Sequence, residues 1–205
     1  MYLHKTPSWL SQLFPNILWQ VNTRDKEIYL TFDDGPVPEA TPWVLDQLDQ
    51  HNAKASFFMV GDNIDKYSEL FQEVVKRQHT VANHTYNHLS GWKTENKKYY
   101  NNISKAEDLL GKASNKLFRP PHGRLKYGQY RNIKKSYKIV MWDVLSGDYN
   151  RLLAPERCLK NTIAATSPGS IIVFHDSVKA IKNLQYVLPR YLNYFAALNF
   201  TFKAL

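Results

Sequence analysis

The sequence contains a single cysteine, Cys158, among its 205 residues. One thiol excludes an internal disulfide framework and a cluster of thiolate ligands for zinc. No apolar run approaches the ~20 residues that a membrane-spanning helix needs. The segment from Met1 to Pro7 has neither the apolar core nor the small-residue cleavage site of a signal peptide. We therefore expect no transmembrane segment and, on the sequence alone, a cytoplasmic location.

Motifs for nucleic-acid binding are absent as well. The chain carries 27 Lys and Arg against 18 Asp and Glu, a net charge of +9. This charge permits an acidic polymer or an anionic surface as partner. The basic residues are scattered, however, with the densest run at 93–98 and the next at 134–138, and no helix-turn-helix, RNP or zinc-finger pattern accompanies them. We therefore expect a solvated basic surface and no nucleic-acid partner.

Short apolar runs rich in β-branched and aromatic residues alternate with amphipathic stretches along the chain. Strands are predicted at 27–33, 54–60, 79–82, 116–119, 138–145 and 170–175. Helices are predicted at 40–51, 65–77, 99–113, 126–136, 155–166 and 179–197. This alternation is typical of an α/β protein with a parallel sheet or barrel. Pro189 is expected to kink or split the last helix.

The length fits one domain spanning 1–205. Residues 1–26 precede the first predicted strand, and the part from 7 to 20 is apolar but irregularly amphipathic. We interpret 1–26 as an N-terminal extension packed on the domain. A membrane-surface anchor is the alternative interpretation of this segment.

Two acids and two histidines stand out within this pattern. Asp33 and Asp34 end the apolar run that starts at Ile28, so both carboxylates lie at a strand mouth. About fifty residues later, His84 and His88 stand four apart, on one face if the segment is helical. Alone, the acids are typical of a turn and the histidines of a surface pair. Together, two histidines and a carboxylate suffice for a catalytic divalent metal, which favours hydrolysis by a metal-activated water.

Further polar residues end the other predicted strands. Arg119 ends the fourth strand in a proline-stiffened loop, where a guanidinium can hold a carboxylate. Asp143 and Asp148 follow the fifth, and either acid can orient a histidine. His175 ends the sixth, and His is suited to donating a proton near neutral pH. Each residue also has a purely structural interpretation. Arg119 would lie in a rigid loop, the two acids in an Asp-rich turn, and His175 would be a buried histidine bonded to the backbone. In a βα barrel, however, all would meet at the strands' carboxyl ends, where active sites lie.

In this order the motifs resemble those of the polysaccharide deacetylases, the NodB-homology domain or carbohydrate esterase family 4. The resemblance covers about 28–202. It rests on five motifs: Thr31-Phe32-Asp33-Asp34, His84-Thr85-Tyr86-Asn87-His88, Arg119-Pro120-Pro121-His122-Gly123, the Trp142–Tyr149 stretch and the Ile172–His175 run. The run from Ala55 to Gly61 is also similar to the family's second strand. Five motifs in order are highly specific.

The resemblance implies a distorted (β/α) barrel of about seven parallel strands. It also implies a metal-dependent enzyme that removes N-acetyl groups from an amino-sugar glycan, either chitin-like or peptidoglycan-like. Asp34, His84 and His88 would bind the divalent metal, most often zinc, with cobalt, nickel or manganese as alternatives. Asp33 would be the general base, and His175 the general acid that protonates the leaving amine. The family often acts at the cell envelope or outside the cell, although no export signal is visible here.

The remaining roles also come from the resemblance. Arg119 would orient Asp33, and Asp148 would tune His175, with Asp143 as the competing acid. The backbone N–H of His122 would help to stabilise the oxyanion. We expect five residues to contact the substrate: Pro121, His122, Gly123, Trp92 and Tyr149.

The sequence departs from the family pattern at three positions. Leu145 stands at the first Asp of the fourth motif, Tyr149 at its Trp, and His122 at the usual Tyr of the third motif. None of these is a predicted metal ligand, base or acid, so activity stays the expectation. An O-acetyl esterase and a non-catalytic glycan-binding domain are the alternatives. A non-haem iron oxygenase also uses two His and a carboxylate, but it leaves Asp33 and Arg119 unexplained.

Overall fold

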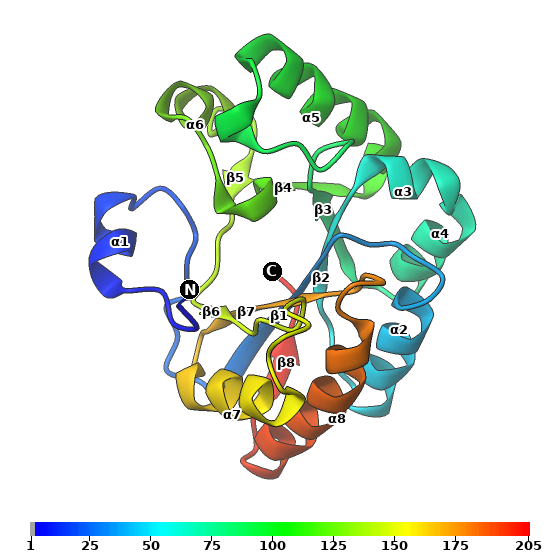
Figure 1. Ribbon diagram of the computed structural model, residues 1–205, viewed down its shortest axis with the longest axis vertical. Helices are drawn as coiled ribbons and strands as arrows, with labels where there is room; N and C mark the ends of the chain where they lie inside the picture. The colour runs from blue at the N-terminus through cyan, green and yellow to red at the C-terminus, as the bar shows by residue number, and fades with distance from the viewer. Residues whose placement is uncertain (1–2) are drawn as a thin grey trace.

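The computed structural model describes residues 3–205 as a curled parallel sheet with helices packed around it (Figure 1). The strands are β1 (Glu27–Asp33), β2 (Ser56–Met59), β3 (Thr80–Asn83), β4 (Ser114–Phe118), β5 (Lys138–Ile139), β6 (Val144–Leu145), β7 (Ile171–His175) and β8 (Thr201–Lys203). The α-helices are α1 (Ser8–Leu13), α2 (Thr41–Gln50), α3 (Gly61–Lys66), α4 (Ser68–Lys76), α5 (Asn96–Leu110), α6 (Tyr127–Ile133), α7 (Pro155–Ala165) and α8 (Ile181–Ala197). Three short 3₁₀ segments are η1 (Gly91–Lys93), η2 (Gly111–Ala113) and η3 (Pro121–Gly123).

The sheet confirms the predicted fold class. Seven strands lie in the order β5-β4-β3-β2-β1-β7-β6, and β8 pairs with the start of β1. Every pair of named strands is parallel. The sheet curls into a half-barrel, the distorted (β/α) barrel expected from the sequence. The carboxyl ends of its strands therefore meet at one edge.

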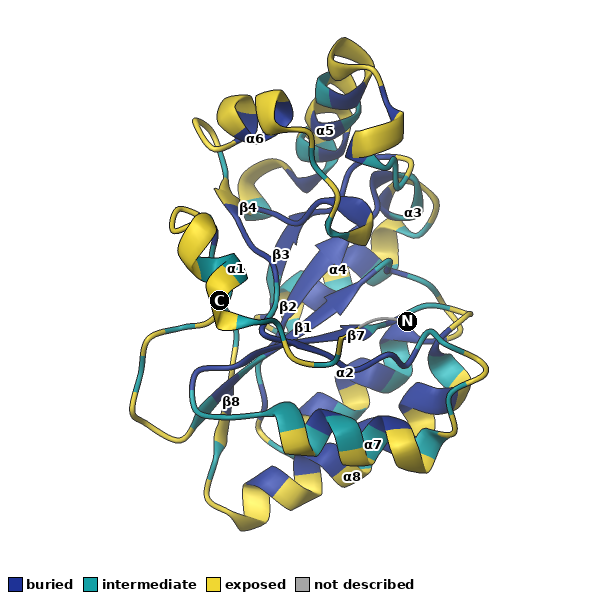
Figure 2. Ribbon diagram, turned by 60° about the vertical axis from the view of Figure 1, so that its left-hand side comes forward, coloured by how far each residue is buried: buried dark blue, intermediate teal, exposed yellow. Residues whose placement is uncertain are grey.

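The central strands are apolar because both of their faces are covered. Phe32 on β1 pairs in register with Phe57 on β2 and Phe174 on β7, and its ring stacks on both at 5.1 and 5.9 Å. Tyr191 of α8 contacts Phe174 edge-on at 5.5 Å. Since neighbouring residues of a strand face opposite sides, Thr31 and Asp33 face the other side, toward the interior of the half-barrel. The stacked rings thus fix the strands that carry the polar residues. Figure 2 shows these central strands as buried.

The predicted strand at 138–145 is wrong, because the chain forms two short strands there, β5 and β6, at opposite ends of the sheet. The residues between them bond to other partners. Met141 N donates to Leu18 O, and Leu18 also bridges Val140. The carbonyls of Val140 and Met141 accept bonds from the buried guanidinium of Arg119. These distant partners take the backbone groups that a continuous strand would use.

Three further differences concern helices and the chain end. The predicted helix at 65–77 is two helices, because Tyr67 leaves helical geometry (φ −127°, ψ 51°) between α3 and α4. α8 is not split at Pro189, and buried residues on both sides of the proline pack onto the core. The strand β8 and the short helix α1 were not predicted. None of the helices within 3–205 combines the length and apolar character that a membrane crossing requires.

The N-terminal segment touches the sheet at three points. Lys5 bridges Val144, Leu18 bridges Val140 and Gln20 bridges Ser170. Ile17 is buried, whereas α1 buries no residue. These contacts agree with an extension packed on a single domain, and that domain organisation stays a prediction.

Candidate metal and active site

The polar residues singled out in the sequence lie at the carboxyl ends of four strands of the sheet. Asp33 is the last residue of β1, and Asp34 follows it. His84 follows β3, Arg119 follows β4, and His175 is the last residue of β7. These strands lie within the run β4-β3-β2-β1-β7 of one parallel sheet, so residues far apart in the sequence meet at its carboxyl edge.

The backbone at Asp34 lets two consecutive acids serve one site. Neighbouring strand residues face opposite sides, but Asp34 lies just beyond β1 with φ 82°, in the left-handed region. The amide of Asn63 donates to the Asp34 carbonyl at 2.7 Å and holds this turn. His88 also has a positive φ, 54°. Such backbone strain persists only where the surrounding structure enforces it, and it is concentrated at functional sites.

Asp34, His84 and His88 form a donor set for one metal ion. Their ligand atoms all lie within 4.8 Å of one another. Asp34 Oδ1 is 3.1 Å from His88 Nε2 and 3.7 Å from His84 Nε2. Two ligands about 2.0–2.1 Å from a tetrahedral zinc ion lie roughly 3.4 Å apart, so the observed spacings fit.

Protonation also favours metal binding. His84 Nδ1 donates to the carbonyl of Arg119 at 2.7 Å, which leaves Nε2 as the acceptor facing the site. Burial lowers the pKa of His84 to about 4, so the ring is neutral at physiological pH. Burial alone would raise the pKa of Asp34, but the hydrogen bond from His88 and the nearby His175 and His84 hold it below its ordinary value. Neutral imidazoles and an ionised carboxylate are what a divalent cation needs.

Asp33 is held by a buried guanidinium. Arg119 is fully buried, and its Nη1 donates to Asp33 Oδ1 at 2.6 Å and to Thr31 Oγ1 at 2.8 Å. Nη2 donates to the carbonyl of Met141 at 2.8 Å, and the guanidinium lies 4.0 Å from the ring centre of Phe58. A buried pair of this kind is strongly destabilised when one partner is removed. The arrangement fixes one carboxylate oxygen of Asp33 and leaves Oδ2 for other partners.

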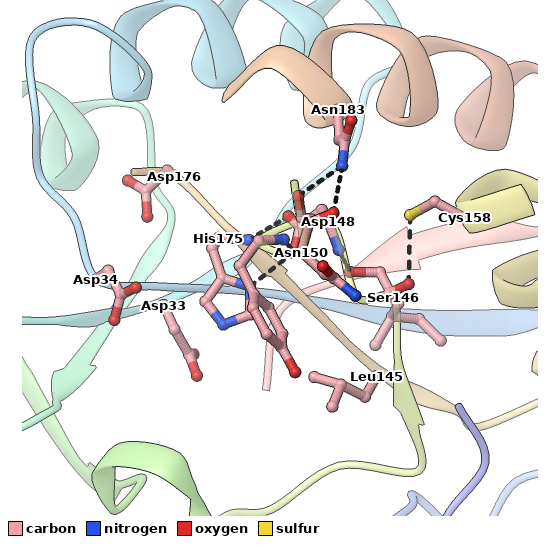
Figure 3. Close-up of polar contacts among 12 residues, drawn as sticks. Asp33, Asp34, Leu145, Ser146, Asp148, Asn150, Cys158, His175, Asp176 and Asn183 are labelled. Carbon is pink, nitrogen blue, oxygen red and sulfur yellow. Dashed lines mark hydrogen bonds and ion pairs between the residues drawn. The ribbon is translucent and has the colours of Figure 1, made fainter. Parts of the chain in front are cut away.

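His175 is paired with Asp148 on the side away from Asp33 and Asp34 (Figure 3). Nδ1 of His175 donates to Asp148 Oδ1 at 2.8 Å, and its backbone N–H donates to Oδ2 at 2.7 Å. Burial would lower the pKa of His175, but the Asp148 charge and hydrogen bond raise it to about 9. The competing acid, Asp143, instead binds Lys5 at 2.6 Å. The structure thus brings Asp148, not Asp143, to His175.

Asn183 of α8, which was not predicted, holds the loop that carries Asp148. Its amide donates to the carbonyls of Asp148 and Asn150, both at 3.1 Å. A buried asparagine on an amphipathic helix gives no sequence signal for this role, because its partners are backbone groups more than thirty residues away.

Asp176 was also missed, and it connects the loop after β1 to the end of β7. Its Oδ1 accepts from Gly35 N at 3.1 Å and its Oδ2 from Thr41 Oγ1 at 2.6 Å, while Thr41 Oγ1 accepts from Val37 N at 2.8 Å. A side chain at Gly35 would place its Cβ 2.0 Å from Asp176 Oδ2, so only glycine fits there. Burial raises the pKa of Asp176 to about 8, against the effect of the Thr41 and Gly35 bonds.

Two of the predicted substrate contacts line the site. The exposed ring of His122 lies edge-on to His88 at 4.7 Å, and burial of its inner part lowers its pKa. Tyr149 lies edge-on to His175 at 4.9 Å. Both replacements of the family's usual residues therefore sit beside the ligand and acid positions.

The other three predicted contacts are Pro121, Gly123 and Trp92, and each packs against other residues of the fold. Pro121 is buried. A Cβ on Gly123 (φ 66°) would lie 2.7 Å from the ring of Trp142, so this glycine allows a close approach. Trp92 donates to the carbonyl of Leu125 at 3.0 Å and shares an apolar cavity of about 340 Å³ with Gly123 and residues of the N-terminal segment. The role of Trp92 in substrate binding stays a prediction.

The strand ends of a parallel half-barrel thus present two histidines and an aspartate that could hold a metal ion, an acid held by Arg119 and a histidine held by Asp148. Comparisons with known proteins agree. The family model described as polysaccharide deacetylase matches residues 20–142. The chain belongs to this family, whose members are metal-dependent.

Two curated relatives are peptidoglycan-N-acetylglucosamine deacetylases from Bacillus cereus. One is 36% identical over 74% of this chain and 56% of its own length, and the other is 33% identical over 78% and 77%. A chitooligosaccharide deacetylase of Bradyrhizobium is 34% identical over 74% of this chain and 71% of its own. The chain thus spans little more than half of the first relative.

Solved structures support the same fold. A crystal structure of a peptidoglycan N-acetylglucosamine deacetylase in complex with 4-naphthalen-1-yl-N-oxidanyl-benzamide has a TM-score of 0.88 and 28% identity, covering 98% of this chain and 95% of its own. A pseudoenzyme of carbohydrate esterase family 4 from Bacillus anthracis has a TM-score of 0.82 at 21% identity, covering 96% and 69%. This second likeness shows the fold alone. Activity must therefore be argued from the residues of the site.

Proposed function

We propose that this protein hydrolyses the N-acetyl group of N-acetylglucosamine units in a glycan, releasing acetate and a free amine. The observation that carries the proposal is the donor set of Asp34, His84 and His88, with Asp33 and His175 as separate acid–base groups beside it. The names of the relatives support an amino-sugar substrate. They include both peptidoglycan and chitooligosaccharide enzymes, so the glycan itself is part of the proposal.

The metal ligands are proposed to be Asp34, His84 and His88. Two nitrogens and one oxygen suit zinc best, with cobalt, nickel and manganese as further candidates. A divalent cation held there would act as a Lewis acid at the acetyl carbonyl and lower the pKa of water.

Asp33 is proposed as the general base. Arg119 occupies one carboxylate oxygen, so the other is oriented to take a proton from the attacking water. Water adds its oxygen to the amide carbon, and the backbone N–H of His122 is proposed to stabilise the resulting oxyanion. His175, kept protonated by Asp148, then gives its proton to the nitrogen as the C–N bond breaks. The proton taken by Asp33 and the one given by His175 balance over the reaction.

The test measures acetate release from N-acetylglucosamine oligomers and from purified peptidoglycan. Metal-stripped protein is compared with protein reloaded with zinc, cobalt, nickel or manganese. We expect release only from reloaded protein. Asp33→Asn should lower kcat by about 10²–10⁴-fold while its metal content, measured by mass spectrometry, stays unchanged.

The outcomes separate the alternatives. Release from O-acetylated xylan and from none of the N-acetyl substrates would replace this proposal by an esterase. Bound metal without release from any substrate would indicate a glycan-binding domain. Loss of metal in Asp33→Asn would show that the roles of Asp33 and Asp34 are assigned wrongly.

A further inference from the structure

The excess positive charge of the chain lies almost wholly in one segment. Residues 93–138 contain thirteen Lys and Arg and three Asp and Glu, whereas the rest of the chain contains fourteen basic and fifteen acidic residues. The segment thus carries +10 and the remainder −1. The expectation that the basic residues are scattered is therefore wrong.

This segment, called here the basic lobe (residues 93–138), forms one side of the molecule. It contains α5, α6, β4, β5 and the 3₁₀ segments next to them, and Figure 1 shows α5 and α6 on the opposite side from α7 and α8. Within residues 3–205, only two of its thirteen cations have a carboxylate within 4.0 Å: Lys116 and the buried Arg119. The other eleven are exposed. In contrast, Arg77, which follows α4 outside the basic lobe, contacts three carboxylates.

A hollow of the basic lobe adjoins the loop that carries the metal-ligand histidines. It has a volume of about 420 Å³ and is lined by Glu95, Lys97, Lys98, Asn101, Asn102 and Lys105. Asn102 Oδ1 accepts from the backbone N–H groups of Tyr86 and Asn87 at 2.9 and 3.0 Å, within the His84–His88 loop. Lys105 Nζ lies 3.5 Å from the centre of the Tyr86 ring. Asn102 and Lys105 of the hollow therefore contact this loop directly.

The one carboxylate in the hollow, Glu95, bonds to backbone groups, and no lysine side chain of the described residues pairs with it within 4.0 Å. Glu95 accepts from the backbone N–H groups of Lys97 and Lys98 at 2.9 and 3.0 Å and so caps α5. On the other side of the site, Arg124 follows His122 by two residues and lies 5.1 Å from the ring centre of Trp92. Unpaired cations thus flank the loops of both His88 and His122.

We propose that the basic lobe binds anionic groups, carboxylate or phosphate, carried by the glycan that the site deacetylates, and that the Lys97–Lys98 hollow takes one of them. This inference rests on the proposed function. Like charges gathered on one side repel each other and weaken folding, whereas an anionic polymer neutralises them and is drawn toward the site. A neutral glycan gains nothing from them. The salt dependence of activity distinguishes the two cases, because exposed charges are screened beyond ~8 Å at physiological ionic strength.

The first experiment varies the charge of the substrate and the salt. Acetate release is measured at about 20 and about 300 mM NaCl on four substrates. These are native peptidoglycan, peptidoglycan stripped of phosphodiester polymers by hydrofluoric acid, the stripped material with its carboxylates amidated, and the neutral N-acetylglucosamine pentamer. We expect kcat/KM on the anionic forms to fall about tenfold between the two salts, and kcat/KM on the amidated form and the pentamer to stay constant. The treatment that removes the salt effect identifies phosphate or carboxylate as the group bound.

The second experiment changes the hollow. Lys97→Gln with Lys98→Gln keeps helix propensity, and the Glu95 cap uses backbone groups that the change leaves in place. The matched control is Arg157→Gln with Lys160→Gln, two exposed cations of α7. We expect the hollow variant to lose kcat/KM several-fold on anionic glycan at low salt and to keep its rate on the pentamer, while the control keeps both.

Equal salt dependence on neutral and anionic substrates, or equal losses in the hollow and control variants, would overturn the inference and leave a solvated face only. Binding of the parent and hollow variant to duplex DNA is measured alongside. If the hollow variant loses only DNA binding and keeps its rate on every glycan, the inference is overturned in favour of a nucleic-acid surface. Absence of acetate from all four substrates at both salts is a different result, because it would remove the proposed function itself.

Discussion

At the scale of single residues, the environments of His84 and His175 differ in the way that their proposed roles, metal ligand and proton donor, require. His84 is buried against a carbonyl, so its pKa falls to about 4. His175 is buried as well, but Asp148 raises its pKa to about 9. Two environments that push pKa values apart thus agree with the proposed ligand role of His84 and the proposed acid role of His175.

The first prediction concerns this pair. In Asp148→Asn, the pKa of His175 should fall from about 9 toward its ordinary ~6.5. Since the acid must be protonated, the alkaline limb of the pH dependence of kcat should move to lower pH by a similar amount. The His175–Asp148 pair also stabilises the folded protein in a pH-dependent way. Its contribution to the free energy of unfolding is fully present below pH ~6.5 and is lost as the pH rises through about 9.

The pH dependence of kcat between about 6 and 10 tests this, with Asp143→Asn as the matched control because Asp143 binds Lys5 instead. The control should keep the alkaline limb of the parent. An unshifted limb in Asp148→Asn, or an equal shift in both variants, would contradict the role given to Asp148.

A residue's role could be predicted from the sequence where a short local motif indicates that role. Asp33, Asp34, His84 and His88 were predicted because chemistry-bearing residues recur at fixed short spacings. Asp176 was not, since it acts on Thr41 and Gly35, which are 135 and 141 residues away in the sequence. Neighbours in sequence hold no information on such contacts.

At the scale of elements, the loop between β1 and α2 is held by buried side-chain bonds in addition to backbone bonds. Thr41, the first residue of α2, donates to Asp176 and accepts from Val37 N. Both bonds are made by one hydroxyl, and Thr41 is fully buried. The loop that carries Asp34 is thus fastened to the end of β7, beside His175.

The second prediction is that Thr41→Val destabilises the protein by about 1–3 kcal/mol, because it leaves the buried Asp176 carboxylate and the Val37 N–H without their partner. Thr41→Ser keeps the hydroxyl and should unfold at nearly the urea midpoint of the parent. Urea unfolding of metal-free protein measures both. If the valine and serine variants unfold at the same midpoint, the hydroxyl bridge does not stabilise the loop.

The same scale explains where the strand and helix predictions succeeded. β1 was predicted at its observed ends, because an apolar run followed by Gly and Pro has clear limits. The region 138–145 was not, because Leu18 and Arg119, both distant in sequence, bond its backbone. The fold class needed only the alternation of elements, whereas the edge of the sheet depended on these long-range bonds.

At the scale of the whole molecule, the proposed metal site would join the ends of two strands that lie far apart in the sequence. Asp34 follows β1, and His84 and His88 follow β3, with β2 between these strands. A cation bound to all three would connect the strands across their carboxyl ends. Any ligand that binds only the folded state stabilises it by mass action.

The last prediction follows from this linkage. Zinc at about 100 times its Kd should add ~2.7 kcal/mol to the free energy of unfolding, which for a chain of this length raises Tm by roughly 5–10 °C. His88→Ala should lose most of this rise, because it removes one of three ligands. His51→Ala, which changes a histidine at the end of α2 that bonds to Gln47 and Asn193, should keep it. Asp33→Asn should keep it too, because Asp33 is bound to Arg119 rather than placed among the ligands. Calorimetry of EDTA-treated and zinc-loaded protein gives the four values. A full rise in His88→Ala would show that the cation binds elsewhere, and a lost rise in Asp33→Asn would move Asp33 from base to ligand.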